Sequence, residues 1–275
     1  MKITHFGKEL IIDERLKAQC DFVFLPRIAK NWDNIIPITG MEGTGKTTLA
    51  FILAWYLSGP NTRIVFTFEQ FSEAFNSLSA GGTIIWDEFI FAGMSSDANS
   101  KLTKLAKKIF VTGRKKRLNI LLLMPSIFMM EKYFAFSRTI CLLHCDSPDF
   151  INRGYAYWYS QKRKNIIRGS EQLKNTFNTP LRNANFHFRF ELPPNELYSE
   201  EEYQKAKDEA ISTLFKEDKE DKPKDGRELK FKVRFLKDHI DDLLSMSEEE
   251  SAAIHGVNKR TIAEWKRFIN EKLIK

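Results

Sequence analysis

The chain has 275 residues, 43% of them hydrophobic, which is enough to bury one sizeable core and a small appendage. Its formal net charge of +7 favours an anionic macromolecular partner. Three cysteines, an odd number, argue against a disulfide framework, and the most apolar stretch, residues 120–130, is too short to span a bilayer. The first residues lack the apolar core of a signal peptide. We therefore expect a cytoplasmic protein without a membrane span.

Residues 40–47 carry the strongest motif of the chain. They read GMEGTGKT and match the phosphate-binding pattern G-x-x-x-x-G-K-[ST]. The glycines let successive backbone N–H groups surround a β-phosphate, and the following helix directs its positive dipole end at the same anion. Residues 35–39 predict a buried strand before the loop, and residues 48–57 predict a helix after it. The nucleotide-binding residues that we expect are Gly40, Gly43, Thr44, Gly45, Lys46, Thr47 and Thr48.

Two acids, Asp87 and Glu88, follow an apolar run at residues 83–86. Ligands bind at the carboxyl ends of parallel strands, so these carboxylates are expected at the same edge as the loop. In a hydrolytic site Lys46 would contact the β- and γ-phosphates of ATP, while Thr47 and, through water, Asp87 would hold Mg²⁺. Glu88 would polarise the attacking water as the general base. The alternative is an ordinary strand followed by an exposed acidic turn.

Alternating strand and helix patterns predict the fold class. We expect strands at residues 63–68, 83–86, 119–124 and 139–144, and helices at 69–78, 100–111 and 127–136. This alternation is typical of an α/β protein with a mostly parallel sheet flanked by helices. Together with the phosphate-binding motif it resembles a RecA-like P-loop NTPase. Residues 1–34 suggest a strand pair, and the aromatic segment 155–167 predicts a hairpin. Cys141, His144 and Cys145 lie in an apolar run at residues 139–145, where alternate residues of a strand face opposite ways, and no further cysteine pair completes a zinc site.

The composition changes at Pro193 and Pro194, which predicts a division into domains. We expect an ATPase domain at residues 1–195, a helical and charged linker at 196–227, and a small all-α helix-turn-helix-like domain at 228–275. In the last, Ser247 and Asn258 would each cap a helix, and the second helix would expose Lys259, Arg260 and Lys266. This module would bind DNA; the alternative is a helical module that contacts protein.

Two groups of basic residues would contact DNA phosphates without reading the base sequence. They are Lys101, Lys104, Lys107 and Lys108, at helical spacing, and Lys162, Arg163, Lys164 and Arg168, beside the aromatic segment. A solvated charged face is the alternative for each group.

Residues 113–126 read GRKKRLNILLLMPS, and residues 136–143 read FSRTICLL. With the loop and the acidic strand, this region resembles P-loop ATPases of the additional-strand type, and among them the FtsK/HerA DNA-pumping ATPases with their zonula occludens toxin-like phage branch. The resemblance implies a homo-oligomer, with a hexameric ring as one form. It also implies Ser126 as a polar sensor, where these motors commonly carry Gln, and Arg138 as an arginine finger acting across a subunit interface. Arg114 and Arg117 are the next candidates for that finger.

Three functions follow from these features. The leading hypothesis is Mg²⁺-dependent ATP hydrolysis coupled to DNA binding and translocation, in a viral or plasmid packaging, transfer or replication motor with a phage, plasmid or nuclease partner protein. The second is a nucleotide-controlled DNA-binding adaptor or regulator. The third, an AAA+-type helicase loader, requires a helical lid after the sheet, whereas residues 145–195 have an aromatic, strand-like pattern.

Overall fold

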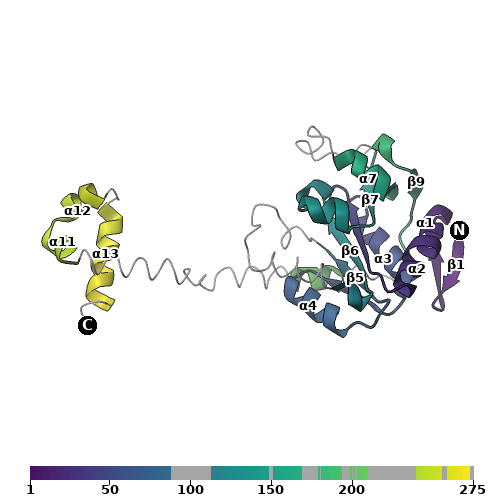
Figure 1. Ribbon diagram of the computed structural model, residues 1–275, viewed down its shortest axis with the longest axis horizontal. Coiled ribbons are helices and arrows are strands. Elements are labelled where there is room, and N and C mark those ends of the chain that lie inside the picture. Colours follow the sequence, from purple (N-terminus) through teal and green to yellow (C-terminus); the bar gives the residue numbers. More distant parts are fainter. Residues whose placement is uncertain are drawn as a thin grey trace. The chain divides into compact units, whose positions relative to one another are not determined.

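The computed structural model describes residues 1–87, 113–148, 151–168, 179, 181–193, 199, 201, 203–209, 240–255 and 259–272 (Figure 1). The chain divides into two compact units, residues 1–211 and 212–275, and each is described by itself. Several residues with an expected function lie outside the described ones: Glu88, Lys101, Lys104, Lys107, Lys108 and Asn258.

A sheet of seven strands, counted over the described residues, forms the centre of the first unit, in the order β4-β5-β6-β3-β7-β8-β9. The strands are β3 (Asn34–Thr39), β4 (Thr62–Val65), β5 (Thr83–Trp86), β6 (Asn119–Met124), β7 (Cys141–Asp146), β8 (Tyr155–Ser160) and β9 (Phe186–Arg189). The strands from β4 to β7 in this order pair in parallel, and β8 and β9 add two antiparallel pairings. The predicted α/β class with a mostly parallel sheet is confirmed.

Alternate residues of the central strands contact helices on opposite faces of the sheet. On one face Ile36 of β3 belongs to a core cluster with α3 (Lys46–Ser58). On the other face Trp86 of β5 packs against α4 (Phe68–Ser77), where the ring of Phe71 stacks on it with the centroids 4.2 Å apart. Strands β3, β5 and β6 are buried along their whole length, as expected for strands covered on both faces.

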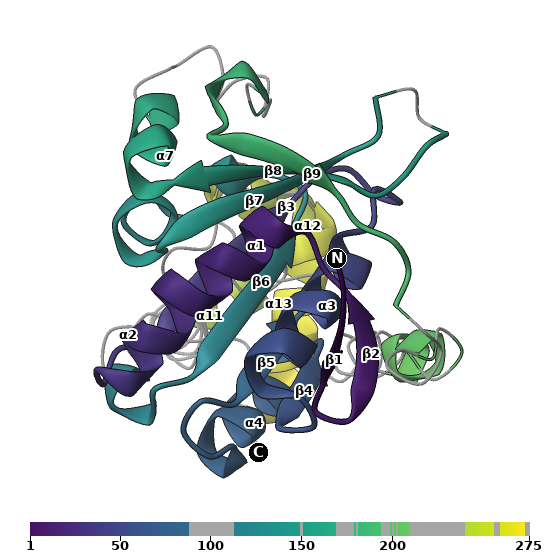
Figure 2. The same cartoon turned by 90° about the vertical axis from the view of Figure 1, so that its right-hand side faces the viewer.

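The N-terminal residues form a hairpin and a helical stretch. The hairpin strands β1 (Lys2–His5) and β2 (Lys8–Ile11) pair antiparallel beside α3 (Figure 2), and the indole N–H of Trp55 donates to the carbonyl oxygen of His5 at 3.0 Å. The strand pair therefore forms as predicted. The helical stretch, which the sequence pattern does not predict, comprises α1 (Glu14–Gln19), the π-helical turn η1 (Cys20–Phe24) and α2 (Leu25–Ala29).

The hairpin prediction for residues 155–167 is wrong. Strand β8 pairs with β7 and β9, and the residues after it form helix α7 (Gln161–Arg168). Lys164 of this helix is fully buried, and its ammonium donates to the carbonyl oxygen of Thr139 at 2.6 Å. Burial lowers the pKa of Lys164 to about 8. Lys164 is thus a packed residue in the core and is unavailable to DNA.

The predicted helix at residues 127–136 is also replaced by shorter turns. The chain forms a 3₁₀ turn, η4 (Ile127–Met129), and a π-helical turn, η5 (Phe134–Arg138). A 3₁₀ turn, η3 (Gly113–Lys116), precedes β6, and another, η6 (Leu181–Asn183), precedes β9.

The described part of the second unit consists of three helices, α11 (Ile240–Ser245), α12 (Glu248–His255) and α13 (Lys259–Lys272). Ser247 and Glu250 form a reciprocal capping box at the start of α12, with bonds of 3.2 and 3.0 Å between side chains and main chain. Lys266 differs from its predicted exposed position, because its ammonium donates to the carbonyl oxygen of Met246 at 2.6 Å. Among the helices of the described residues, none has the length and apolar character needed to cross a membrane.

Candidate nucleotide-binding site

The phosphate loop leaves the carboxyl end of β3 and enters α3. Gly40, Gly43 and Gly45 have φ angles of +144°, +77° and +96°, which side-chain-bearing residues rarely adopt. The hydroxyl of Thr44 donates to the carbonyl oxygen of Met41 at 2.8 Å and holds the turn closed. The predicted loop therefore forms in the chain, with α3 beginning at Lys46.

Lys46 lies over this loop. Its ammonium donates to the carbonyl oxygens of Gly40 and Met41 at 2.9 and 2.8 Å. Burial lowers the pKa of Lys46, and the nearby carboxylates of Asp87 and Glu42 counteract this effect. A partly desolvated cation held against the loop is well suited to binding the phosphates of a nucleotide.

Asp87 directly follows β5 and is 5% exposed. The hydroxyl of Thr47 donates to its Oδ2 at 3.3 Å, so two residues separated by 40 positions in the sequence meet beside the loop. A hydroxyl and a carboxylate are hard oxygen ligands, which Mg²⁺ prefers. The residues present therefore fit the metal: Thr47 and Asp87 would hold Mg²⁺, which supplies charge neutralisation for phosphoryl transfer when bound.

A cavity of about 810 Å³ opens beside the loop. Of the expected residues, Gly43, Gly45, Lys46, Thr47, Thr48 and Asp87 line it. Its size lies in the range of small-molecule sites. Among the residues that the structure describes, four cationic side chains line this cavity, namely Lys46, Arg153, Arg189 and Lys207.

Sequence reasoning missed Arg153 and Arg189, which β8 and β9 bring to the loop. Gly154 (φ +87°) precedes β8, and a Cβ there would lie 2.3 Å from the carbonyl oxygen of Phe190. This close approach places Arg153 beside the loop, with a guanidinium nitrogen 4.0 Å from where a Cβ on Gly43 would lie. Arg189 stacks on the ring of Tyr155 at 4.9 Å. The dipeptide Arg153-Gly154 before an aromatic strand is the only sequence signal for this wall of the cavity.

Ser126, the expected sensor, follows β6 at the same edge of the sheet. It is 3% exposed, and its hydroxyl accepts from the main-chain N–H of Phe128 at 3.4 Å, which caps η4. The preceding Met124 and Pro125 line the cavity. The sensor role of Ser126 stays a prediction.

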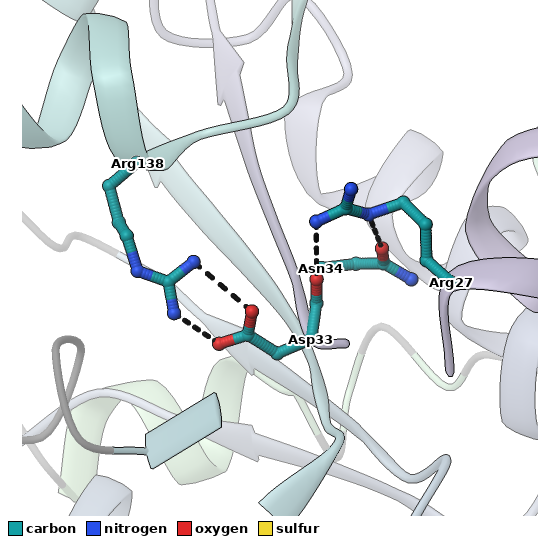
Figure 3. A network of polar contacts seen from close by, with 4 residues as sticks. All are labelled: Arg27, Asp33, Asn34 and Arg138. Carbon is teal, nitrogen blue, oxygen red and sulfur yellow. Dashed lines mark hydrogen bonds and ion pairs between the residues drawn. The ribbon is translucent and has the colours of Figure 1, made fainter. Parts of the chain in front are cut away.

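Arg138 lies at the opposite edge of the sheet from the loop, before β7 and beside the start of β3. Its guanidinium forms a bidentate ion pair with Asp33, and Arg27 approaches Asp33 and Asn34 from the other side (Figure 3). The side chains of Arg138 and Asp33 are only 15% and 4% exposed. This placement argues against the expected arginine finger, because reaching a neighbouring subunit would leave a buried carboxylate unpaired.

Arg114 and Arg117, the other candidates for the arginine finger, precede β6. They therefore also lie at the edge of the sheet formed by the amino ends of the parallel strands, which we call the amino edge. The guanidinium of Arg114 lies 3.6 Å from the ring centroid of Trp32, and Arg117 donates to the side chain of Asn31 at 3.1 Å.

The strand order identifies the type of fold. Strand β6 lies between β3, which carries the phosphate loop, and β5, which carries Asp87. The fold is that of an additional-strand P-loop NTPase. The resemblance drawn from the loop and the acidic strand is confirmed at this level.

No protein-family model and no curated protein matches the chain. Among solved structures, the chain is similar to the N-terminal domain of zonular occludens toxin from Neisseria meningitidis, with 14% identity, a TM-score of 0.42, and coverage of 61% of this chain and 100% of that one. It is also similar to the genome packaging NTPase B204 from Sulfolobus turreted icosahedral virus 2 in complex with ATP-gammaS, with 9% identity, a TM-score of 0.35, and coverage of 48% and 94%.

Proposed function

We propose that the chain is a Mg²⁺-dependent ATP hydrolase that binds and moves DNA, as a motor in viral or plasmid packaging, transfer or replication. The observation that carries this proposal is the convergence of the phosphate loop, Lys46, Thr47 and Asp87 on one cavity of about 810 Å³. The same residues fit a nucleoside triphosphate and its Mg²⁺ ion. Hydrolysis, rather than binding alone, is supported by Glu88, which follows Asp87 directly in the sequence.

Each residue of the site has a role in this proposal. The loop N–H groups and Lys46 bind the phosphates, and Thr47 and Asp87 hold Mg²⁺. Glu88 polarises the attacking water. Arg153 and Arg189, from the same chain, replace Arg138 as the cations that stabilise charge developing on the phosphoryl oxygens.

Exposed basic residues support an anionic polymer as partner. At the amino edge of the sheet Trp32 is 42% exposed, with Arg114 stacked on it, and Lys30 and Lys115 beside them in the sequence are exposed as well. Lys162 and Arg163 are exposed on α7. Guanidinium and ammonium groups beside an exposed tryptophan are typical of surfaces that bind the nucleic-acid backbone.

The proposal is tested by ATP turnover with and without duplex DNA, in the wild type and in Glu88→Gln. We expect DNA to stimulate the wild type and Glu88→Gln to lose turnover while still binding ATP. Lack of stimulation together with full turnover in Glu88→Gln would reject the proposal. A homo-oligomer, including a ring, belongs to the same proposal, and images of the nucleotide-bound particle on DNA test it.

A nucleotide-controlled DNA-binding adaptor or regulator is the second candidate. The capping box of α12 and the exposed Lys259 and Arg260 at the start of α13 favour it, because a basic helix start can contact DNA. Sequence-specific footprints that require residues 245–275, without directional movement, would favour this function over a motor. An AAA+-type loader has less support, because the described part of residues 145–193 holds β8, β9 and α7.

A further inference from the structure

Tyr203 belongs to a short helix, residues 203–209, that borders the nucleotide cavity. The side chain is buried, and its ring contacts two other rings at the rim of the site. The centroid of Phe51, on α3, lies 6.5 Å away at an edge-to-face angle of 86°, and that of Phe66, after β4, lies 5.8 Å away. These contacts fix the position of the phenol ring independently of its hydroxyl.

The hydroxyl of Tyr203 donates to Oδ2 of Asp87, the oxygen that also accepts from Thr47. Asp87 is therefore held by one donor from the phosphate-loop helix and one from helix 203–209. Donors of this kind satisfy the oxygen of a buried carboxylate, and their directions set its orientation. The hydrogen bond spans 116 positions in the sequence and links distant parts of the first unit.

Helix 203–209 also contributes other side chains to the wall of the cavity. Gln204 and Lys207 line it together with Tyr203. Lys207 lies one turn after Tyr203, and its charge is close enough to Lys46 to lower the pKa of that residue. One helix thus places a phenol on the carboxylate of Asp87 and an ammonium in the wall of the cavity that Lys46 also lines.

The geometry points to Tyr203 as a positioning residue that orients Asp87 for Mg²⁺ in the nucleotide complex. This inference rests on the proposed function, because it requires Thr47 and Asp87 to hold the metal. Tyr203 acts through Asp87 and does not itself contact the reacting atoms. Its hydroxyl holds the carboxylate of Asp87 in one orientation, so that the metal binds without first reordering the side chain.

The test compares Tyr203→Phe with the wild type in the full chain. Phenylalanine keeps the ring contacts with Phe51 and Phe66 and removes only the hydroxyl. We measure the affinity for a fluorescent non-hydrolysable ATP analogue over a series of Mg²⁺ concentrations and in EDTA. We expect the affinity in EDTA to be unchanged and the Mg²⁺ concentration for the half-maximal effect to rise about ten-fold, as expected for loss of a hydrogen bond to a charged group.

Two further variants sharpen the result. Tyr133→Phe removes the hydroxyl of a tyrosine that is 50% exposed, and it should match the wild type. In an Asp87→Asn background, Tyr203→Phe should add no further change in Mg²⁺ dependence, because the two residues act through one hydrogen bond.

An unchanged Mg²⁺ dependence in Tyr203→Phe, with or without a lower unfolding temperature, would show that the bond is merely structural and would overturn the inference. A lower Mg²⁺ requirement would also overturn it, because the hydroxyl would then compete with the metal. If the wild type itself shows no Mg²⁺-dependent nucleotide binding, the proposed function fails together with the inference. If the wild type binds the nucleotide in a Mg²⁺-dependent way and Tyr203→Phe has the same Mg²⁺ requirement, only the inference about Tyr203 is rejected.

Discussion

Gly40 packs directly against the main chain of Cys145: a Cβ on Gly40 would lie 2.3 Å from the carbonyl oxygen of Cys145. The first glycine of the phosphate loop is therefore fixed by the neighbouring strand β7 as well as by its φ angle of +144°.

Gly40→Ala is expected to separate the loop from β7. We expect the free energy of unfolding to fall by about 1–3 kcal/mol and nucleotide binding to be lost. The reason is that the carbonyl oxygen of Cys145 can move away from the new methyl group only if strand β7 shifts. Chemical denaturation and ATP binding measure the two effects. Gly7→Ala is the matched control, since Gly7 also has a positive φ of +77° but nothing within 4 Å of its Cβ position. Equal effects of the two substitutions would contradict the packing explanation.

Lys46→Met should separate activity from stability. The substitution removes the cation over the loop, and we expect ATP turnover to fall by a factor of about 100 or more. The unfolding temperature should stay the same or rise, because burial of Lys46 disfavours its charge, as the lowered pKa indicates. Lys132→Met, at an exposed position, is the control and should leave turnover unchanged. Normal turnover in Lys46→Met would exclude the loop as the catalytic site.

Arg138→Met tests whether this arginine acts within its own fold or as a finger. Because Asp33 would be left buried without its ion-pair partner, we expect the free energy of unfolding to fall by about 3 kcal/mol. Adding Asp33→Asn should recover part of this loss, and turnover per folded molecule should remain near that of the wild type. Denaturation and turnover are measured on the same samples. A stable variant that lacks turnover would instead support the arginine finger.

The stability of the first unit should depend on the protonation of His144. Its Nδ1 lies 2.9 Å from the hydroxyl of Thr39, and burial lowers its pKa to about 4. In the unfolded chain the pKa is about 6.5, so the unfolded state binds more protons between these values. The contribution of neutral His144 to the free energy of unfolding is therefore fully present above pH 6.5. It falls by about 1–3 kcal/mol as the pH drops to 4. His144→Gln should lack this pH dependence of the free energy of unfolding. His187→Gln, at an exposed position, is the control and should retain it.

Arg153→Ala should weaken the binding of ATP by about ten-fold, because its guanidinium lies beside the loop at the cavity wall, where it would pair with phosphate. Titration with a fluorescent ATP analogue measures the affinity. Arg163→Ala removes an exposed arginine on α7 and serves as the control. An equal, small effect of both would mean that Arg153 contributes only general positive charge.

The sequence predicts the parts of the fold whose determinants are local. The phosphate loop needs glycines at fixed spacing, and α4 has its capping box of Thr67 and Gln70 within four residues. Buried parallel strands are visible as apolar runs, which is why the strand before the loop and the one before Asp87 are recognisable. These elements define the loop, the central sheet and the positions of the expected metal ligands.

The remaining parts depend on contacts between distant segments. Helix α7 follows an aromatic strand without a clear break, and it is stabilised by the buried bond from Lys164 to Thr139, 25 positions away. Arg138 has the sequence position expected of a finger, but its partner Asp33 lies 105 positions earlier. Local patterns contain no information about such pairings, so the hairpin at 155–167 was a wrong prediction and the cavity wall at Arg153 and Arg189 was missed.

Helix 203–209 also sets the smallest fragment that contains all of the described residues lining the candidate site. A fragment that ends at residue 195, after the two consecutive prolines, would lack Tyr203, Gln204 and Lys207 and would leave Phe51 and Phe66 without the ring that covers them. The first unit, by contrast, extends to residue 211. Fragments for biochemical study should therefore retain residues 1–211, although the two prolines suggest an earlier domain boundary.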